Sequence, residues 1–142
     1  MHRTGWTGHR REAMGKARVL LVDDDREIAR ALARVLATAG FDATWESTEE
    51  GALERVLRET FDVVLTDLRL GEVSGLDIIR QLRASRPQLP VVLMTGYGTT
   101  DTAIEAMKLG AYDYVLKPLN GAELLPLLGA AAEAGRRQAD VA

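Results

Sequence analysis

Acidic residues follow two apolar runs of this sequence and point to a divalent cation. Three consecutive aspartates, Asp23–Asp25, follow the run Arg18–Val22, and Asp67 follows the run Val63–Thr66. Clustered carboxylates raise one another's pKa and destabilise a fold unless a cation offsets their charge. Carboxylate oxygens with retained water suit Mg²⁺ better than zinc. The acids therefore predict a magnesium site.

A hydroxyl and an ammonium group follow two later apolar runs. Thr95 ends the run Val91–Met94, and Lys117 ends the run Tyr114–Leu116. A carboxylate beside a divalent cation can attack phosphorus, and a lysine and a hydroxyl opposite it can hold the phosphoryl oxygens. Taken singly, each residue has an ordinary explanation as a helix cap, a strand end or a solvated charge. Together with the acids, they predict a Mg²⁺-dependent aspartyl phosphate.

These side chains need strands and helices that bring them to one place. The expected strands are Arg18–Val22, Ala43–Trp45, Val63–Thr66, Val91–Met94 and Tyr114–Leu116. Four of these runs lack polar alternation, as strands buried on both faces do, and the second is weaker and typical of an edge. Helical patterns separate them, which predicts an α/β fold, (βα)5, with a five-stranded doubly wound parallel sheet. Ligands bind such sheets at the carboxyl ends of the strands, where the polar residues should converge.

Helix signals lie between the runs. Three helices are expected to begin at a capping residue followed by an acid three positions later: Ser47, Ser74 and Asn120. The apolar residues at helical spacing include Ile28, Leu32, Val35 and Leu36 in one helix and Ile104 and Met107 in another. Gly40 and Gly110 mark two helix ends. Pro126 lacks a backbone N–H, which predicts a kinked or frayed last helix.

The composition is that of a single globular domain. The chain has 142 residues, of which 46% are hydrophobic and 27% charged, and it has no cysteine. The absence of cysteine excludes a disulfide scaffold, a thiolate metal site and a cysteine nucleophile. No apolar run approaches the roughly 20 residues that span a bilayer. We expect a cytoplasmic protein without a membrane partner.

Charge is unevenly spread along the chain. Residues 1–18 carry five positive charges and one negative charge, whereas residues 19–142 carry 13 positive and 20 negative charges. An acidic body argues against direct nucleic-acid binding. We expect a basic, disordered leader over residues 1–15, a domain over residues 16–129, and a weakly cohesive tail or the start of a linker over residues 130–142.

Four segments together resemble one known family. They are VLLVDDD (Val19–Asp25), VVLTDLRL (Val63–Leu70), VVLMTG (Val91–Gly96) and YDYVLKP (Tyr112–Pro118). The sequence from Ala17 to Leu128 is similar to the receiver domain of two-component response regulators. Residues 94–118 most resemble receivers of the sigma-54-dependent, enhancer-binding type. The resemblance implies a flavodoxin-like strand order of 2-1-3-4-5.

The resemblance implies a role for each polar residue. Asp67 would accept the phosphoryl group and also contact the metal, Lys117 would bind the phosphate, and Thr95 would be the switch hydroxyl. Asp23 and Asp24 would form the acidic pair that holds Mg²⁺, with Asp24 as the direct ligand and Asp23 acting through water.

Five further expectations concern the surroundings of this site. By resemblance, the backbone carbonyl of Arg69 completes the metal shell, Tyr114 is the switch aromatic that turns inward, and the Lys117–Pro118 peptide is cis. Asp25 has no such role and is expected to cap a helix. Neither tryptophan is expected at the site.

The implied function is phosphorelay signal transduction with transcription as the output. The domain would accept its phosphoryl group from a sensor histidine kinase or a phosphotransfer protein, and it would be no enzyme beyond its own phosphorylation and dephosphorylation. The added charge would recruit Thr95 and Lys117. Tyr114 would then fill the vacated space and repack the surface of the fourth helix, fifth strand and fifth helix, which would form a homodimer or an output contact.

One departure and three alternatives stay open. Gly71 and Glu72 stand where related regulators usually carry Pro-Gly, which leaves the shape of the loop after Asp67 open. A degenerate receiver would act only as an interaction module. A haloacid-dehalogenase-type phosphatase also has an Asp-x-Asp after a strand, but Glu27 replaces its expected Thr or Val. A flavodoxin-like flavin binder needs a hydroxyl- and glycine-rich loop where this chain has acids.

Overall fold

The chain alternates strands and helices. The computed structural model describes residues 15–70, 73–96 and 100–141. Its elements in chain order are β1 (Arg18–Val22), α2 (Arg26–Thr38), β2 (Asp42–Glu46), α3 (Glu49–Arg58), β3 (Val63–Asp67), β4 (Arg69–Leu70), β5 (Val73–Ser74), α4 (Gly75–Ser85), β6 (Val91–Thr95), α5 (Thr100–Lys108), β7 (Asp113–Leu116) and α6 (Gly121–Val141). Each predicted strand is present, with bounds that differ by one residue at most at either end.

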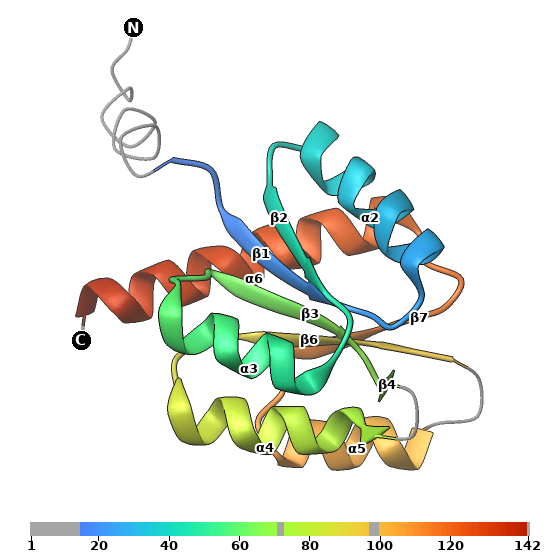
Figure 1. Cartoon of the computed structure of the whole chain (residues 1–142). Helices are drawn as coiled ribbons and strands as arrows, with labels where there is room; N and C mark the ends of the chain where they lie inside the picture. The colour runs from blue at the N-terminus through green and yellow to red at the C-terminus, as the bar shows by residue number, and fades with distance from the viewer. Residues whose placement is uncertain (1–14, 71–72, 97–99, 142) are drawn as a thin grey trace, which may run out of the picture.

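Five strands form one parallel sheet in the order β2-β1-β3-β6-β7. Every neighbouring pair is parallel, so the carboxyl ends of all five strands lie along one edge. Figure 1 shows α2 and α6 on one face of this sheet and α3, α4 and α5 on the other, as the two core clusters also require. Counted within the sheet, the order is 2-1-3-4-5, which confirms the predicted doubly wound fold.

The central strands bury side chains on both faces. In β1, Leu20 and Val22 pack toward α3, α4 and α5, whereas Val19 and Leu21 pack toward α2 and α6. Successive side chains of a strand point to opposite faces, which explains this division. A strand covered on both sides has no exposed face for polar residues, and this accounts for the unbroken apolar runs.

Four apolar side chains on the helices are more exposed than their spacing predicts. In α2, Ile28 and Val35 are 38% and 43% exposed, and Ala29 takes a core position beside them. In α5, Ile104 and Met107 are 50% and 41% exposed. Small side chains let a helix approach the sheet closely, so alanines face the core and the larger residues lie at the edge of the stripe. Helical spacing of apolar residues therefore did not by itself identify which of them are buried.

Capping residues start the helices, with one shift from the prediction. The cap of α3 is Thr48 rather than Ser47, because α3 begins one residue later and the Thr48 Oγ1 accepts the Gly51 N–H at 3.0 Å. Asn120 caps α6 as predicted, since its Oδ1 accepts a first-turn N–H at 2.9 Å. The side chain of Ser74 lies outside the described residues. Because α4 begins at Gly75, directly after Ser74, the pattern located all three helix starts to within one residue.

The helix ends at two glycines agree with the prediction. Gly40 follows α2 and Gly110 follows α5, with φ of +95° and +106°. This left-handed region costs glycine little and lets the chain reverse. After α2, the Phe41 N–H then donates to the Leu36 carbonyl at 2.9 Å.

The last helix, α6, continues further than the sequence suggested. It runs unbroken past Pro126, whose exposed ring lies in the early turns of the helix, where the lost hydrogen bond can be replaced by water. Ala131 and Ala132 are 0% and 2% exposed and belong to the core shared with α2. The expectations of a frayed helix and of a weakly cohesive tail after residue 129 are therefore wrong, whereas the kink at Pro126 stays a prediction.

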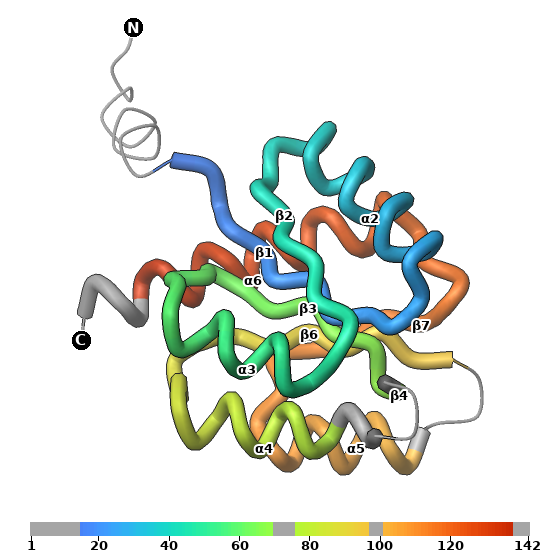
Figure 2. Tube along the Cα trace, in the orientation of Figure 1, coloured from blue at the N-terminus to red at the C-terminus, as the bar shows by residue number. Residues whose placement is uncertain are grey.

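The part of α6 around Gly135 and Arg136 lies beside the amino end of β3, as Figure 2 shows, and contacts Asp62 there. A Cβ at Gly135 would lie 2.4 Å from the Asp62 carbonyl oxygen and 2.9 Å from Pro90 Cδ, so the close approach needs glycine. Arg136 Nε lies 3.2 Å from Asp62 Oδ1. Within the described part of the chain, no helix is long and apolar enough to cross a membrane.

A short antiparallel hairpin follows β3. In it, β4 pairs with β5 through Arg69 opposite Ser74 and Leu70 opposite Val73. Gly71 and Glu72, where the sequence departs from related regulators, lie outside the described residues, as does the leader up to residue 14. The loop after Asp67 therefore begins and ends as paired backbone.

Candidate functional site

Four neighbouring strands bring the predicted polar residues to one edge of the sheet. Asp23 follows β1, Asp67 ends β3, Thr95 ends β6 and Lys117 follows β7. The Lys117 Nζ lies 2.7 Å from Asp67 Oδ2, although the two residues are 50 positions apart in sequence. The carboxyl ends of parallel neighbours meet, and this contact is the direct result. The predicted convergence is a feature of the structure.

The Asp67 carboxylate is held from two sides. Its Oδ1 accepts the Arg69 N–H at 3.1 Å, and its Oδ2 contacts the Lys117 ammonium. Its side chain is only 13% exposed. The next N–H along the chain, that of Leu68, donates to the Met94 carbonyl at 2.9 Å, which fixes the backbone directly after the carboxylate. Asp67 is therefore a positioned, nearly buried carboxylate beside a cation.

Lys117 and Thr95 are joined through the backbone. The Lys117 N–H donates to the Thr95 carbonyl at 2.7 Å, which continues the pairing of β6 and β7 by one residue. The Lys117–Pro118 peptide is cis, as predicted. Thr95 is 1% exposed, and its hydroxyl donates to the Gly96 carbonyl at 3.4 Å. The hydroxyl and the ammonium thus belong to adjacent strands next to Asp67.

Asp23 is the most buried acid of the site. It is 0% exposed, its Oδ1 accepts the Asp25 N–H at 2.9 Å, and its Oδ2 has no hydrogen-bond partner among the described residues. Burial raises the pKa of Asp23, and the nearby carboxylates of Asp67 and Asp24 raise it further, while the Asp25 hydrogen bond and Lys117 act in the opposite direction. A buried carboxylate oxygen without a hydrogen-bond donor is an acceptor that a bound cation could satisfy.

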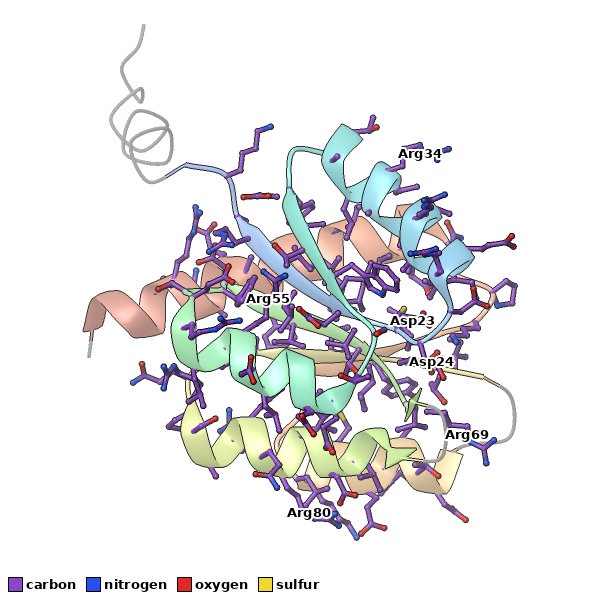
Figure 3. All side chains as sticks on the ribbon, in the orientation of Figure 1. Asp23, Asp24, Arg34, Arg55, Arg69 and Arg80 are labelled. Carbon is purple, nitrogen blue, oxygen red and sulfur yellow. The ribbon has the colours of Figure 1, made fainter. Side chains whose placement is uncertain are left out.

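The other two aspartates of the triplet have different surroundings. Asp25 is the N-cap of α2, because its Oδ1 accepts the N–H groups of Glu27 and Ile28 at 3.0 and 3.2 Å. Its predicted capping role is confirmed. Asp24 is exposed, and Figure 3 places it with Asp23 at the end of β1, facing the segment that leads into β4.

Two further predicted positions lie at the surface around the site. Arg69 belongs to β4, and its side chain is exposed on the same side of the molecule as Asp24 (Figure 3). Tyr114 in β7 is 39% exposed and lines a shallow hollow with Ile104 and Met107 of α5. Tyr114 therefore lies outward in this structure. The metal role of the Arg69 carbonyl and the inward turn of Tyr114 stay predictions.

One residue of the site was missed by sequence reasoning. The Trp45 indole Nε1–H donates to the Asp23 backbone carbonyl at 2.7 Å, so the expectation that no tryptophan lies at the site is wrong. Trp45 belongs to the edge strand β2, and its register partner is Leu21, two residues before Asp23. That register, which depends on how β2 pairs with β1, was the missing signal.

The residues present fit Mg²⁺. They offer oxygen donors alone, and the buried Asp23 Oδ2 is an acceptor without a partner in the described part of the chain. Across residues 15–70, 73–96 and 100–141, no three His, Cys, Asp or Glu side chains form a ready-made metal cage. Mg²⁺ does not need such a cage, because it keeps several waters and binds through one or two carboxylates.

Comparison with known proteins agrees with this site. Residues 19–128 match the response regulator receiver domain family. The response regulator protein PilR of Pseudomonas aeruginosa is 38% identical over 118 residues, covering 83% of this chain and 26% of PilR. The transcriptional regulatory protein ZraR of Escherichia coli is 38% identical over 102 residues, covering 72% of this chain and 23% of ZraR. The chain thus spans about a quarter of the length of these relatives.

The fold comparison gives the same result. The crystal structure of a response regulator receiver domain protein from Clostridium thermocellum superposes with a TM-score of 0.82 at 30% identity, covering 86% of this chain and 98% of that one. PilR and ZraR are regulators of the sigma-54-dependent type that residues 94–118 resemble. Neither the phosphatase nor the flavin-binding alternative agrees with these matches. The chain belongs to the response regulator receiver domain family of two-component systems.

Proposed function

We propose that this domain accepts a phosphoryl group on Asp67 from the phosphohistidine of a sensor histidine kinase or a phosphotransfer protein. The observation that carries the proposal is the 2.7 Å contact between Lys117 Nζ and Asp67 Oδ2. A structural ion pair would need only these two groups. Here the pair lies beside a buried acid with an unsatisfied oxygen and a buried hydroxyl, which is the set that phosphoryl transfer requires.

The chemical step can be written from these groups. A carboxylate oxygen of Asp67 attacks phosphorus as the P–N bond of the donor histidine breaks. The electron pair of that bond returns to the imidazole, which is neutralised by a proton. The Lys117 ammonium, which contacts the Asp67 carboxylate before the transfer, would then contact a phosphoryl oxygen. Bound Mg²⁺ would neutralise the remaining phosphoryl charge, with Asp23, Asp24 and the Arg69 carbonyl as its holders.

The phosphorylated carboxylate would then change its neighbours. A phosphoryl group adds about −1.5 to −2 charges and three strong acceptor oxygens. The Thr95 hydroxyl, now on the Gly96 carbonyl at 3.4 Å, would turn toward one of those oxygens. The space that Thr95 leaves would admit Tyr114, which begins 39% exposed. The switch would thus run from the site to the outer face of β7.

That face offers a surface for a second copy of the chain or for an output contact. Its exposed apolar side chains are Ile104 and Met107 of α5 and Tyr114 and Leu116 of β7. Strand β7 is an edge strand, so nothing in the sheet covers its outer side. An inward turn of Tyr114 would remove one of these four side chains from the patch. As part of a longer regulator, the domain would control transcription through this change.

The proposal is tested by the intact mass of the full chain after treatment with acetyl phosphate and Mg²⁺. We expect the gain of one phosphoryl group, its loss in hydroxylamine, and no gain with excess chelator or in the Asp67→Asn variant. Size-exclusion chromatography of the same samples would report dimerisation. A chain that stays unmodified under these conditions would instead be a degenerate receiver that acts as an interaction module.

A further inference from the structure

Both backbone polar groups of Asp23 are bonded to the neighbouring edge strand β2. The Asp23 N–H donates to the Glu46 carbonyl at 3.1 Å, and the Asp23 carbonyl accepts the Trp45 indole N–H at 2.7 Å. The first bond continues the pairing of β1 with β2 beyond the end of β1. The second is a side-chain contact that the sheet does not require, and it reaches the carbonyl directly before Asp24.

The carboxyl end of β2 is itself firmly placed. Trp45 packs against the core shared by α2 and α6, whereas the Glu46 side chain lies on the opposite face and is bonded by Arg55 of α3. Arg55 also donates to Glu59, the C-cap residue of α3, at 3.0 Å, so the guanidinium that bonds Glu46 is itself held by a second acid. Figure 3 labels Arg55 on α3 and Asp23 directly after the end of β1. The Trp45 indole therefore belongs to a strand end that packs on the core on one face and is ion-paired on the other.

We propose that Trp45 is a positioning residue for the acidic pair, and that its indole reports metal binding at the site. The inference rests on the proposed function, because it assumes that Asp24 and Asp23 hold Mg²⁺. A peptide unit is planar, so fixing the Asp23 carbonyl also fixes the direction of the Asp24 N–H. The backbone from which both carboxylates project is then set before the cation arrives, and binding avoids part of the ordering cost.

The same contact makes the indole sensitive to the site. The N–H···O bond of 2.7 Å is made to the peptide unit that joins Asp23 to Asp24, the two residues that carry the carboxylates. A divalent cation on those carboxylates changes the field at the indole, since Asp23 is buried and poorly screened. The fluorescence of Trp45 should therefore change as Mg²⁺ binds, with the midpoint of the binding itself.

The test uses the full chain with Trp45 as its sole tryptophan. The sequence has two tryptophans, so the Trp6→Phe variant isolates Trp45. In this parent, Trp45 is replaced biosynthetically by benzothienylalanine, which keeps the ring shape but lacks the N–H, or by 5-fluorotryptophan, which keeps the N–H. Mg²⁺ dissociation constants are measured by calorimetry and urea unfolding is measured alongside. Asp24→Asn in the parent is the control for loss of the metal site.

We expect benzothienylalanine to raise the Mg²⁺ dissociation constant roughly three- to tenfold, the size expected for one neutral hydrogen bond. The 5-fluorotryptophan protein should bind as the parent does, and the parent's emission should titrate with the calorimetric midpoint. Equal affinity in both analogue proteins, with or without a change in unfolding, would overturn the positioning role. An emission that stays constant while calorimetry saturates would contradict the reporter role. If the parent binds no Mg²⁺, the proposed site itself fails, and the inference fails with it.

Discussion

The acids at the amino ends and at the carboxyl ends of the strands differ in how fully they are paired. At the amino edge, Arg18 donates to Asp62 Oδ2 from its backbone at 2.7 Å and to Glu59 from its guanidinium at 2.8 Å, and Arg136 lies 3.2 Å from Asp62. Glu59 and Asp62 are thus each paired with an arginine. At the carboxyl edge, Asp23 is buried with one oxygen unsatisfied among the described residues.

The pKa values follow this difference. Hydrogen bonds from Arg18 and from Arg55 lower the pKa of Glu59. Burial raises the pKa of Asp23. A paired acid stabilises the fold when ionised, whereas a buried acid without its cation destabilises it. The comparison indicates that the amino edge is built for stability and the carboxyl edge for a ligand.

The largest expected effect comes from removing the cation at the carboxyl edge. Lys117→Ala should slow phosphorylation by acetyl phosphate roughly 10²–10³-fold, because it removes the ammonium that follows the transferred charge. Rates are followed by intact mass. Lys108→Ala, an exposed lysine at the end of α5, is the matched control and should react at the wild-type rate. Similar rates in the two variants would show that Lys117 is only structural.

Matched changes at one acid of each edge test the comparison directly. Asp62→Asn should lower the free energy of unfolding by about 1.5–3 kcal/mol, since it weakens charged hydrogen bonds that are largely buried. Asp23→Asn should raise it at neutral pH in the absence of Mg²⁺. The Asp23 pKa is raised in the folded state, so wild-type stability should fall as pH rises above the ordinary value of 3.8.

Urea unfolding between pH 4 and pH 8 checks both expectations, and the Asp23→Asn variant should lack that part of the decline. Added Mg²⁺ should stabilise the wild type by binding only the folded chain. If Asp23→Asn destabilises the protein as Asp62→Asn does, the two edges do not differ in the way described.

Two glycines of α6 test how the amino edge is closed. Gly135→Ala should destabilise the fold by about 1–3 kcal/mol, because its Cβ would meet the Asp62 carbonyl oxygen at 2.4 Å. Gly129→Ala has no atom within 4 Å of its Cβ and should stabilise the helix by up to about 1 kcal/mol. Chemical denaturation of both variants gives the sign. Two shifts in the same direction would mean that α6 does not pack closely here.

The smallest expected effect separates two adjacent acids. Asp24→Asn should weaken Mg²⁺ binding by on the order of tenfold, as expected for loss of a charged ligand. Asp25→Asn should leave binding nearly unchanged, because Asn caps the helix as well as Asp does. Calorimetry measures both constants. An equal loss in the two variants would show that the acid chosen as the ligand is wrong.

Much of the fold and of the site could be predicted because both depend on local patterns. Unbroken apolar runs located four strands of the sheet and a weaker run located the edge strand β2, and the polar residues after the four strong runs then lay at the carboxyl ends of their strands. Parallel pairing of the strands then brings Asp67 and Lys117 together, and this does not depend on the details of the helices.

The features that were missed depend on packing between distant parts of the chain. The Trp45 bond to Asp23 depends on the register of β2 against β1. Pro126 and the alanine-rich segment suggested a loose end, yet the small side chain of Gly135 lets α6 approach Asp62 closely. Spacing along α2 could not distinguish Ile28, which is exposed, from Ala29, which is buried.

The most direct test of the account is the chemical identity of the phosphorylated residue. The full chain is treated with acetyl phosphate and Mg²⁺ and then with borohydride, which reduces an aspartyl phosphate to homoserine, and its peptides are sequenced by mass spectrometry. The account predicts homoserine at position 67 and an unchanged Asp23 and Asp24. Homoserine at either of those acids, or at any position other than Asp67, would contradict it.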